Sequence, residues 1–531
     1  MICPMPRPNA SLPSDLPSSA LDDGRYLALA ARDARFDGRF FTGVTSTGIY
    51  CRPVCGVRTP RRENCRFFTL AAQAEAAGFR PCLRCRPELA PRSLPWSTQD
   101  APNILVREAL RLLDADGAAF TSLAALAERL GVSDRHLRRV FESALGVSPL
   151  QYVQTRRLLA AKQLLTDTDL PVTQVALASG FGSVRRFNAA FAGHYGLNPT
   201  QLRQRGPARA GGAGGAGGAG GAVTVRLPWR PPLDVAALLR FFALRQIHAV
   251  EQIVETPGRR ALRRTVRLAA SGGGAPLAGW IDVAFDAERP IAWLRVSDAL
   301  HPVLPQVIAR VRGLLDLDAD PQAIHAVLGG DFPGGEGLRV PGALDGFELA
   351  VRAVLGQQIT VAAARTLAQR LVERFGEPLA TPWPELSRLF PAPAVLAAAE
   401  GEALGSLGIV RQRQAAIVAL ARAIDSGQLE LHAGADVAAT TAALCALPGI
   451  GDWTAQYIAM RALRWPDAFP AGDVAIHAAL GLRGQPRPAQ AATARAEAWR
   501  PWRSYAVVRA WTAGSAVPVA TATAADALPK T

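Results

Sequence analysis

A run of glycine and alanine at residues 210–222 divides the 531-residue chain into two halves. The run repeats Ala-Gly-Gly and holds no side chain able to build a core. We therefore expect a flexible, low-complexity linker over residues 206–222. Such a tether keeps the two halves near one another while letting each act somewhat independently.

The composition indicates a globular protein with a polyanionic partner. Half of the residues are apolar (49%), and the length allows three or four domains. The net charge of +15 favours nucleic acid over a membrane, and no apolar run is long enough to cross a bilayer. Residues 1–21 are rich in Pro and Ser without a signal-peptide pattern. We expect disordered tails at 1–21 and 516–531, a cytoplasmic location and a monomer.

Four cysteines occur as two closely spaced pairs, Cys51 with Cys55 and Cys82 with Cys85. Each pair lies in a turn that contains or follows a proline. Four thiolates in two turns fit a closed tetrahedral zinc site, and a domain as small as residues 22–88 needs such a cross-link. The spacing alone predicts a purely structural zinc site, in a domain with short strands at 36–41 and 44–50 and a helix at 69–77.

The residues around these cysteines, TGIYCRPVC at 47–55 and AGFRPCLRC at 77–85, resemble the N-terminal domain of the Ada DNA-repair methyltransferases. The resemblance implies that Cys51 accepts a methyl group from a DNA methylphosphotriester, once per molecule, and that all four cysteines bind one Zn²⁺. Zinc keeps the nucleophilic thiolate deprotonated. Methylation removes negative charge beside the phosphates, so DNA affinity should rise. Arg58 matches a DNA contact of the family, and further arginines are expected at the DNA backbone: Arg52, Arg61, Arg62, Arg66, Arg80 and Arg84. Cys65 is expected in the core.

Residues 103–205 read as helices with an internal repeat of about fifty residues. Each copy is a helix, a glycine-bearing turn and a second helix with arginines outside, which is a helix-turn-helix. Two copies joined by a helix at 151–165 resemble the AraC-type DNA-binding domain, a regulator that can contact RNA polymerase. Phe141, Phe187 and Phe191 are expected in the core. A solvated helix face is the alternative to base reading for the exposed candidates Asp134, Arg135, Arg138, Arg185, Arg186 and Asn188.

The C-terminal half combines a small α/β lobe at 223–300 with a helical region at 301–515. Strands are expected at 222–227, 264–269, 280–285 and 291–296. Within the helical region, Leu447-Pro448-Gly449-Ile450-Gly451 connects two helices. The backbone N–H groups beside Gly449 and Gly451 can turn outward at a helix N-terminus, an arrangement that binds a phosphate. Trp453 and Tyr457 share one helix face, and Asp473 falls where a third helix begins.

This order of lobe, bundle and hairpin resembles the AlkA-type 3-methyladenine DNA glycosylases over residues 222–515. The resemblance implies that Asp473 is the catalytic carboxylate, that Trp453, Tyr457 and Trp511 form the base pocket, and that a monovalent cation binds at the hairpin. Gln358 would fill the gap left by the extruded base, although a simple helix-entry residue is the alternative. Aromatic faces attract the cationic base. The helix dipole favours an ionised Asp473, which stabilises oxocarbenium charge on the sugar.

Two absences refine this prediction. Relatives that also cut the DNA strand carry a lysine nucleophile where Trp453 stands, so we predict hydrolysis of the base alone. No cysteine follows Cys445, which excludes the iron–sulfur cluster of some relatives.

The sequence thus predicts a multidomain protein: a small α+β zinc domain, an all-α double helix-turn-helix, then an α/β lobe with an all-α helix-hairpin-helix bundle. We interpret it as a fused alkylation-repair and response protein acting on damaged and promoter double-stranded DNA. The alternative is a transcription regulator whose glycosylase lobe is catalytically degenerate.

Overall fold

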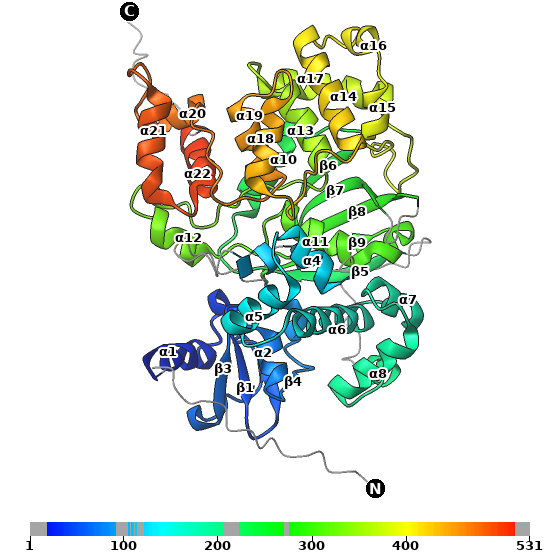
Figure 1. Cartoon of the computed structure of the whole chain (residues 1–531), viewed down its shortest axis with the longest axis vertical. Helices are drawn as coiled ribbons and strands as arrows, with labels where there is room; N and C mark the ends of the chain where they lie inside the picture. The colour runs from blue at the N-terminus through cyan, green and yellow to red at the C-terminus, as the bar shows by residue number, and fades with distance from the viewer. Residues whose placement is uncertain are drawn as a thin grey trace, which may run out of the picture.

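The computed structural model describes residues 19–91, 105–106, 108–110, 112–113, 122–205, 222–269 and 275–515. The predictions for most of the N-terminal tail, the glycine–alanine linker and the C-terminal tail lie outside the described residues. The two halves of the chain are stacked (Figure 1), with the N-terminal half below the C-terminal half. In the described part, no helix has the length and apolar character needed to span a membrane.

The N-terminal domain is a four-stranded sheet with one short helix and a leading helix α1 (Ser19–Ala30). The strand predicted at 36–41 is wrong, because Ala34–Phe36 forms a 3-10 turn in which Asp33 accepts from the amide of Arg35. The second strand starts later than predicted, since the chain turns through Gly48 at φ +67°. The sheet order is β3-β1-β2-β4, with these elements: β1 (Phe41–Val44), β2 (Ile49–Cys51), β3 (Cys65–Phe68), α2 (Ala71–Ala76) and β4 (Arg80–Pro81).

The next domain repeats one helix-turn-helix twice around a long connecting helix. The two second helices have matching ends: Ser133 and Ser183 cap their N-termini, and Gly146 and Gly196 end both at φ +67°. Left-handed backbone of this kind favours glycine. Phe141, Phe187 and Phe191 are fully buried, as expected. The helices are α4 (Leu123–Arg129), α5 (Asp134–Leu145), α6 (Pro149–Asp167), α7 (Val172–Ala178), α8 (Val184–Tyr195) and α9 (Pro199–Arg205).

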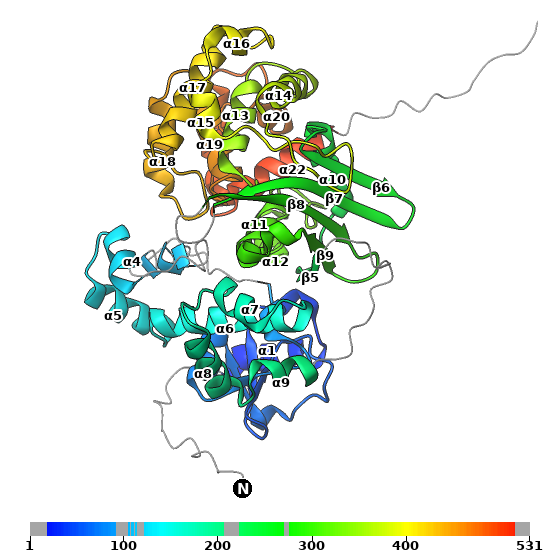
Figure 2. The same ribbon diagram turned by 90° about the vertical axis from the view of Figure 1, so that its right-hand side faces the viewer.

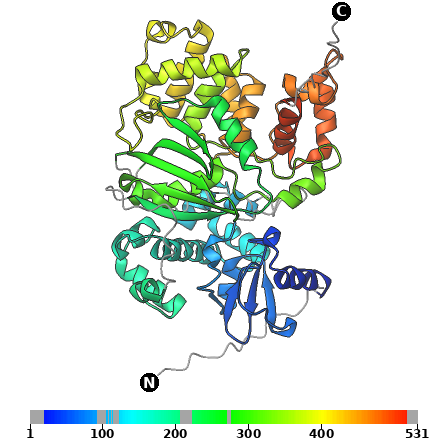
Figure 3. The ribbon, with the colours of Figure 1, turned by 180° about the vertical axis from the view of Figure 1, so that it is seen from behind.

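The C-terminal half begins with a fully antiparallel five-stranded sheet of order β5-β9-β8-β7-β6. One strand, β6, was not predicted. Figure 3 shows the sheet between the helical bundle and the N-terminal half. Its elements are β5 (Val223–Pro228), α10 (Val235–Arg245), β6 (Glu251–Thr256), β7 (Arg259–Leu268), β8 (Leu277–Phe285) and β9 (Ile291–Val296).

The helical region after the sheet carries the hairpin, α18 (Val437–Ala446) and α19 (Asp452–Arg461). Beside it stand α20 (Val474–Ala479), α21 (Pro488–Ala496) and α22 (Arg503–Ser515), as Figure 1 shows. The other elements are η4 (Asp298–Val303), α11 (Leu304–Leu314), α12 (Pro321–Leu328), α13 (Gly346–Leu355), α14 (Val361–Phe375), α15 (Pro393–Ala397), α16 (Gly401–Gly405) and α17 (Arg411–Asp425).

The two halves are packed together, which differs from the independence that the linker composition suggested. One hydrophobic core contains Leu158 of α6 and Phe187 of α8 together with Leu227 of β5 and Leu304 of α11. Figure 2 shows α6 and α7 running beneath the sheet of the C-terminal half. Buried apolar contact, rather than the linker, therefore holds the halves in one arrangement.

Candidate functional site

The hairpin between α18 and α19 presents free backbone amides. Gly449 has φ +75°, and a side chain there would come within 3.3 Å of the Ala416 methyl group. Gly451 caps the N-terminus of α19. Within the described residues, the amides of Gly449 and Gly451 donate to no backbone carbonyl. They are available, beside the positive end of a ten-residue helix, for an anion such as phosphate.

Asp473 caps the N-terminus of α20 and is held by two indoles. Its Oδ1 accepts from the amides of Ala475 and Ile476, both at 3.0 Å, and from the Trp511 indole at 3.2 Å. Its Oδ2 accepts from the Trp453 indole at 3.0 Å. Only 8% of the residue is exposed. The N-cap role and the position beside the predicted aromatics therefore coexist in one carboxylate.

The predicted pocket aromatics lie together around this carboxylate. Trp453 stacks on Tyr457, with centroids 5.3 Å apart and ring planes 11° apart, and Tyr457 lies 6.2 Å from Trp511. A further ring was missed: Phe241 of α10 lies nearly parallel to Trp511 at 6.4 Å. Phe241 precedes Trp511 by far in sequence, and an apolar residue in a helix gave no local signal that it faces this site.

Two arginines lie behind the aromatic rings. Arg461 donates to the Tyr457 hydroxyl, and the carbonyls of Pro341 and Gly342 hold it in place. The guanidinium carbon of Arg461 is 4.8 Å from the Phe241 centroid, and that of Arg245 is 3.8 Å away. Burial alone would raise the pKa of Tyr457, but the charges of Arg461 and Arg245 bring it below its ordinary value. The site thus has a carboxylate at one end and guanidinium groups at the other.

The turn between α13 and α14 is fastened to the hairpin. Gln358 is exposed in this turn with φ +54°, so its side chain is free to project from the surface. The neighbouring Gln357, which sequence reasoning missed, donates to the Gly449 carbonyl at 2.9 Å and to the Thr454 hydroxyl at 3.0 Å. Arg413 donates to the Gln357 carbonyl. These contacts fix the turn relative to the free amides of Gly449 and Gly451.

The four cysteines of the N-terminal domain converge on one point. The Sγ atoms of Cys51, Cys55, Cys82 and Cys85 all lie within 4.8 Å of one another. Zinc–sulfur bonds of about 2.3 Å in a tetrahedron need sulfur atoms about 3.8 Å apart, so the donor set fits Zn²⁺. Hydrogen bonding within the cluster lowers the pKa of Cys55 to about 7 and raises that of Cys51. Cys51 is 6% exposed.

The arginines of this domain divide into exposed and buried ones. Arg58 is exposed, and so are Arg61, Arg66, Arg80 and Arg84. The expectation that Arg52 meets DNA is wrong. Its guanidinium is buried, bound to the Asp37 carboxylate and at 3.0 Å to the Cys85 carbonyl, while its amide donates to Cys85 Sγ at 3.3 Å. Such support of a ligand sulfur is typical of metal sites. Cys65 is buried, as expected.

The helix-turn-helix candidates all lie on exposed helix faces. Arg135 and Arg138 are exposed on α5, and Arg185 and Arg186 on α8. Asp134 and Asn188 are exposed as well, and the Asp134 carboxylate accepts from the Arg135 amide at 2.7 Å.

Family models match four consecutive segments of the chain. Residues 24–88 match the metal binding domain of Ada, and residues 126–205 match a helix-turn-helix domain. Residues 224–345 match the AlkA N-terminal domain, and residues 351–504 match the HhH-GPD superfamily of base excision DNA repair proteins.

Similar proteins match either most of this chain or one part of it. A Mycobacterium tuberculosis protein called a probable bifunctional transcriptional activator/DNA repair enzyme AlkA is 38% identical over 92% of this chain and 95% of its own length. DNA-3-methyladenine glycosylase 2 of Escherichia coli is 36% identical over 54% of this chain and 95% of its own. The bifunctional transcriptional activator/DNA repair enzyme Ada of the same organism is 34% identical over 35% of this chain and 50% of its own. With zinc domain, helix-turn-helix domain and glycosylase domains in this order, the chain belongs to the family of bifunctional transcriptional activator/DNA repair enzymes of the AlkA type.

Proposed function

We propose that the C-terminal half is a DNA-3-methyladenine glycosylase that hydrolyses the N-glycosidic bond of alkylated bases in double-stranded DNA. The observation that carries this proposal is the environment of Asp473. Among the residues that the structure describes, its Oδ1 accepts three hydrogen bonds and its Oδ2 only one. A carboxylate offers about four acceptor positions, so Oδ2 keeps capacity for a further partner.

We assign the chemistry to Oδ2 of Asp473, the oxygen that can accept a further hydrogen bond. Donors on Oδ1 fix the carboxylate and favour its ionised form, while Oδ2 faces the reacting sugar or the attacking water. Negative charge there stabilises the oxocarbenium character that develops as the base leaves. The same oxygen can orient the water and take its proton.

The surrounding groups have separate roles in this proposal. Trp453, Tyr457 and Trp511 hold the extruded base, and Gln358 occupies the gap that it leaves in the duplex. The amides of Gly449 and Gly451 bind one DNA phosphate. A monovalent cation at the hairpin stays a prediction; one nearby carbonyl, that of Gly449, already accepts from Gln357.

The sequence supports hydrolysis without strand cleavage. Lysine occurs in this chain only at positions 162 and 530, so the glycosylase segments between residues 223 and 515 contain none. An amine nucleophile is what a lyase needs for a Schiff base. Trp453 instead donates a hydrogen bond to Asp473.

For the N-terminal half we propose methyl transfer and promoter binding. Cys51, Cys55, Cys82 and Cys85 would hold zinc, which would keep the Cys51 sulfur deprotonated. The Cys51 thiolate attacks the methyl carbon of a DNA methylphosphotriester, so the S–C bond forms as the methyl C–O bond breaks and the DNA phosphodiester leaves as an anion. Arg58 contacts the DNA backbone. The exposed arginines of the two recognition helices read promoter DNA: Arg135, Arg138, Arg185 and Arg186. Recruitment of RNA polymerase, a monomeric state and a cytoplasmic location stay predictions.

A base-release assay on methylated duplex DNA tests the glycosylase. Asp473→Asn should release 3-methyladenine at least about a hundredfold more slowly, because an amide carries no charge. Asp436→Asn is the matched control: Asp436 also caps a helix, accepting from Ala439 at 2.6 Å, but caps α18 rather than the pocket. Full activity of Asp473→Asn would refute the assignment. No release by the wild-type protein would favour a regulator with a degenerate glycosylase lobe.

Mass spectrometry after incubation with methylphosphotriester DNA tests the zinc domain. One methyl group should appear on Cys51 in the wild-type protein, and Cys65→Ser should leave this result unchanged. A purely structural zinc site predicts no methyl group on any cysteine.

A further inference from the structure

One fully buried arginine joins the two halves of the chain. Arg230, between β5 and α10, has no exposed surface. Its Nε donates to the Asp37 carbonyl at 2.8 Å and its Nη2 to the Pro91 carbonyl at 3.1 Å, both in the zinc domain. Its Nη1 donates to the carbonyls of Asp318 and Ala319, at 2.6 and 3.1 Å, in the glycosylase half. A single guanidinium therefore binds both halves at once.

The surroundings of Arg230 are shaped for this contact. Burial lowers its pKa to about 10, which reflects the cost of removing the charge from water. Such a group is tolerated where acceptors replace water, and here four carbonyls do so. Gly38 has φ +73°, and a side chain there would reach within 1.9 Å of the Pro91 carbonyl oxygen and 3.2 Å of Arg230. The zinc-domain loop thus requires glycine to bring its backbone to the arginine.

Further polar contacts surround this anchor. Arg39 of the zinc domain pairs with Asp320, the N-cap of α12. On the other side, Arg226 of β5 lies 3.4 Å from the Asp167 carboxylate of α6, and its carbonyl accepts from Gln163 at 3.3 Å. The contact surface is therefore a set of specific charged and hydrogen-bonded pairs.

Both zinc-binding loops support these anchors directly. From the first loop, Arg52 clamps the carboxylate of Asp37, the residue whose carbonyl accepts from Arg230. From the second loop, the Cys82 carbonyl accepts from Lys162 of α6 at 3.1 Å, and Lys162 is 1% exposed. Arg86, which follows Cys85, pairs with Asp167 at 2.6 Å. The four-cysteine centre thus ties together the loops that hold the neighbouring domains.

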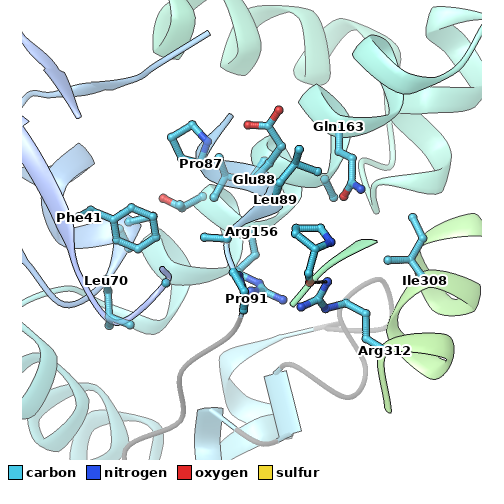
Figure 4. A pocket seen from close by; sticks show the side chains of 18 of the residues that line it. Phe41, Leu70, Pro87, Glu88, Leu89, Pro91, Arg156, Gln163, Ile308 and Arg312 are labelled. Carbon is cyan, nitrogen blue, oxygen red and sulfur yellow. Dashed lines mark hydrogen bonds between the residues drawn. The ribbon is translucent and has the colours of Figure 1, made fainter. Parts of the chain in front are cut away.

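The junction also contains a partly open cavity of about 140 Å³. Figure 4 shows side chains from three parts of the molecule around it: Leu70 and Leu89 of the zinc domain, Gln163 of α6, and Ile308 and Arg312 of α11. A cavity forfeits apolar contact, so the polar anchors add to the shared apolar core at this joint.

We propose that the zinc domain docks on the glycosylase half through a specific surface centred on Arg230, and that the four-cysteine zinc centre keeps this surface in shape. The occupant of the surface is the segment of residues 24–91 of the same chain. Loss of zinc then weakens the contact between the halves. Zinc occupancy therefore affects the glycosylase half through this interface rather than through the linker.

The test uses the full chain with a protease recognition sequence inserted within residues 210–222. The folded, zinc-loaded protein is cut, and the association of the two halves is measured by gel filtration and by dissociation on dilution. We expect the cut halves to co-elute. Arg230→Gln should raise their dissociation constant at least about thirtyfold, because the carbonyls lose a buried cation. Arg39→Gln, at a partly exposed pair, should raise it about threefold.

A second variant distinguishes the support from the zinc-binding loop from the docking contact of Arg230. Asp37→Asn keeps the carbonyl that binds Arg230 but loses its charged pairing with Arg52. We expect one zinc per chain and at least about fivefold weaker association. Arg61→Gln, an exposed arginine of the same domain, is the matched control and should change nothing. Chelation of zinc should raise the dissociation constant of the cut halves, although the apolar core shared with α6 and α8 remains, while the C-terminal half keeps its circular-dichroism melting transition.

Four results would overturn the proposal. Halves that separate as soon as the zinc-loaded wild type is cut would exclude a docking surface. Unchanged association in both Arg230→Gln and Arg39→Gln would exclude the surface centred on Arg230. Wild-type association in zinc-loaded Asp37→Asn would exclude control by the zinc centre, and so would an unchanged dissociation constant after zinc is removed.

Discussion

The indole of Trp453 donates to Oδ2 of Asp473 at 3.0 Å, while its ring stacks on Tyr457 at 5.3 Å. One residue therefore links the aromatic cluster to the carboxylate oxygen that has spare acceptor capacity. In the proposed reaction, this side chain would set the position of the sugar relative to the extruded base.

Trp453→Phe should keep the stacking and lose the hydrogen bond. A hydrogen bond to a charged group contributes roughly 1.5–3 kcal/mol, so we expect single-turnover base release to slow by about 10- to 100-fold. Binding of abasic DNA should change less than threefold, because the wall remains aromatic. Trp383→Phe, in a residue that packs edge-on against Trp280 away from the pocket, is the control. Equal loss in both variants would point to a general packing effect.

The arginines behind the pocket predict an early tyrosine titration. A neighbouring cation favours phenolate, so Arg461 and Arg245 lower the pKa of Tyr457, whereas burial raises those of Tyr50, Tyr195 and Tyr505. In an ultraviolet titration, Tyr457→Phe should remove the step at lowest pH. Arg461→Gln should move that step to higher pH, and Tyr505→Phe should leave it in place. An unmoved step in Arg461→Gln would contradict the electrostatic link.

A buried acid near the domain junction predicts a pH-dependent stability. Burial raises the pKa of Asp316 from 3.8 to about 6, although it accepts from the Tyr505 hydroxyl at 2.9 Å. The folded state holds this proton more tightly than the unfolded state, so the contribution is present below pH about 4 and is lost as pH rises through about 6. The loss is on the order of 2–3 kcal/mol at neutral pH.

Asp316→Asn should therefore melt at a higher temperature than the wild type at pH 7, and this advantage should vanish near pH 4. The amide also tolerates the positive φ of +49° at this position. Melting curves of the two proteins at both pH values measure the effect. Asp331→Asn serves as a comparison, since hydrogen bonds from Trp499 and Arg495 lower the pKa of that acid and give the opposite dependence.

The candidate site was predictable where its signal is local and was missed where it depends on distant packing. Gly449, Gly451, Trp453 and Tyr457 lie in one short motif, and Asp473 follows at a helix start, so spacing alone places them near one another. Phe241 comes from another domain and shows only as an apolar helix residue. The same limit explains Arg52, which looked like a DNA contact because its burial against Asp37 has no trace in the local sequence.

The glycine-rich composition likewise predicted a flexible linker, but it did not predict how the two halves that the linker joins pack together. The complementary contacts that hold the halves together, such as Arg230 on the carbonyls of Asp37 and Pro91, use backbone acceptors. Any residue type offers such a carbonyl, so no sequence pattern marks the partner of a buried arginine. The fold of each domain was predicted from its motifs and the family resemblance that they carry, whereas the docking of the domains was not.

The two hairpin glycines should respond differently to the same substitution. Gly449 has φ +75° and little room, so Gly449→Ala combines a strained backbone with a contact at 3.3 Å and should cost about 1–2 kcal/mol of stability. Gly451 has φ −93° and open space where a side chain would stand, so Gly451→Ala should leave the melting temperature unchanged. Both alanines stand beside the free amides, and both should weaken binding to abasic DNA if those amides hold a phosphate. Weaker binding in Gly449→Ala alone would mean that the turn only needs its backbone conformation, and that the phosphate contact lies elsewhere.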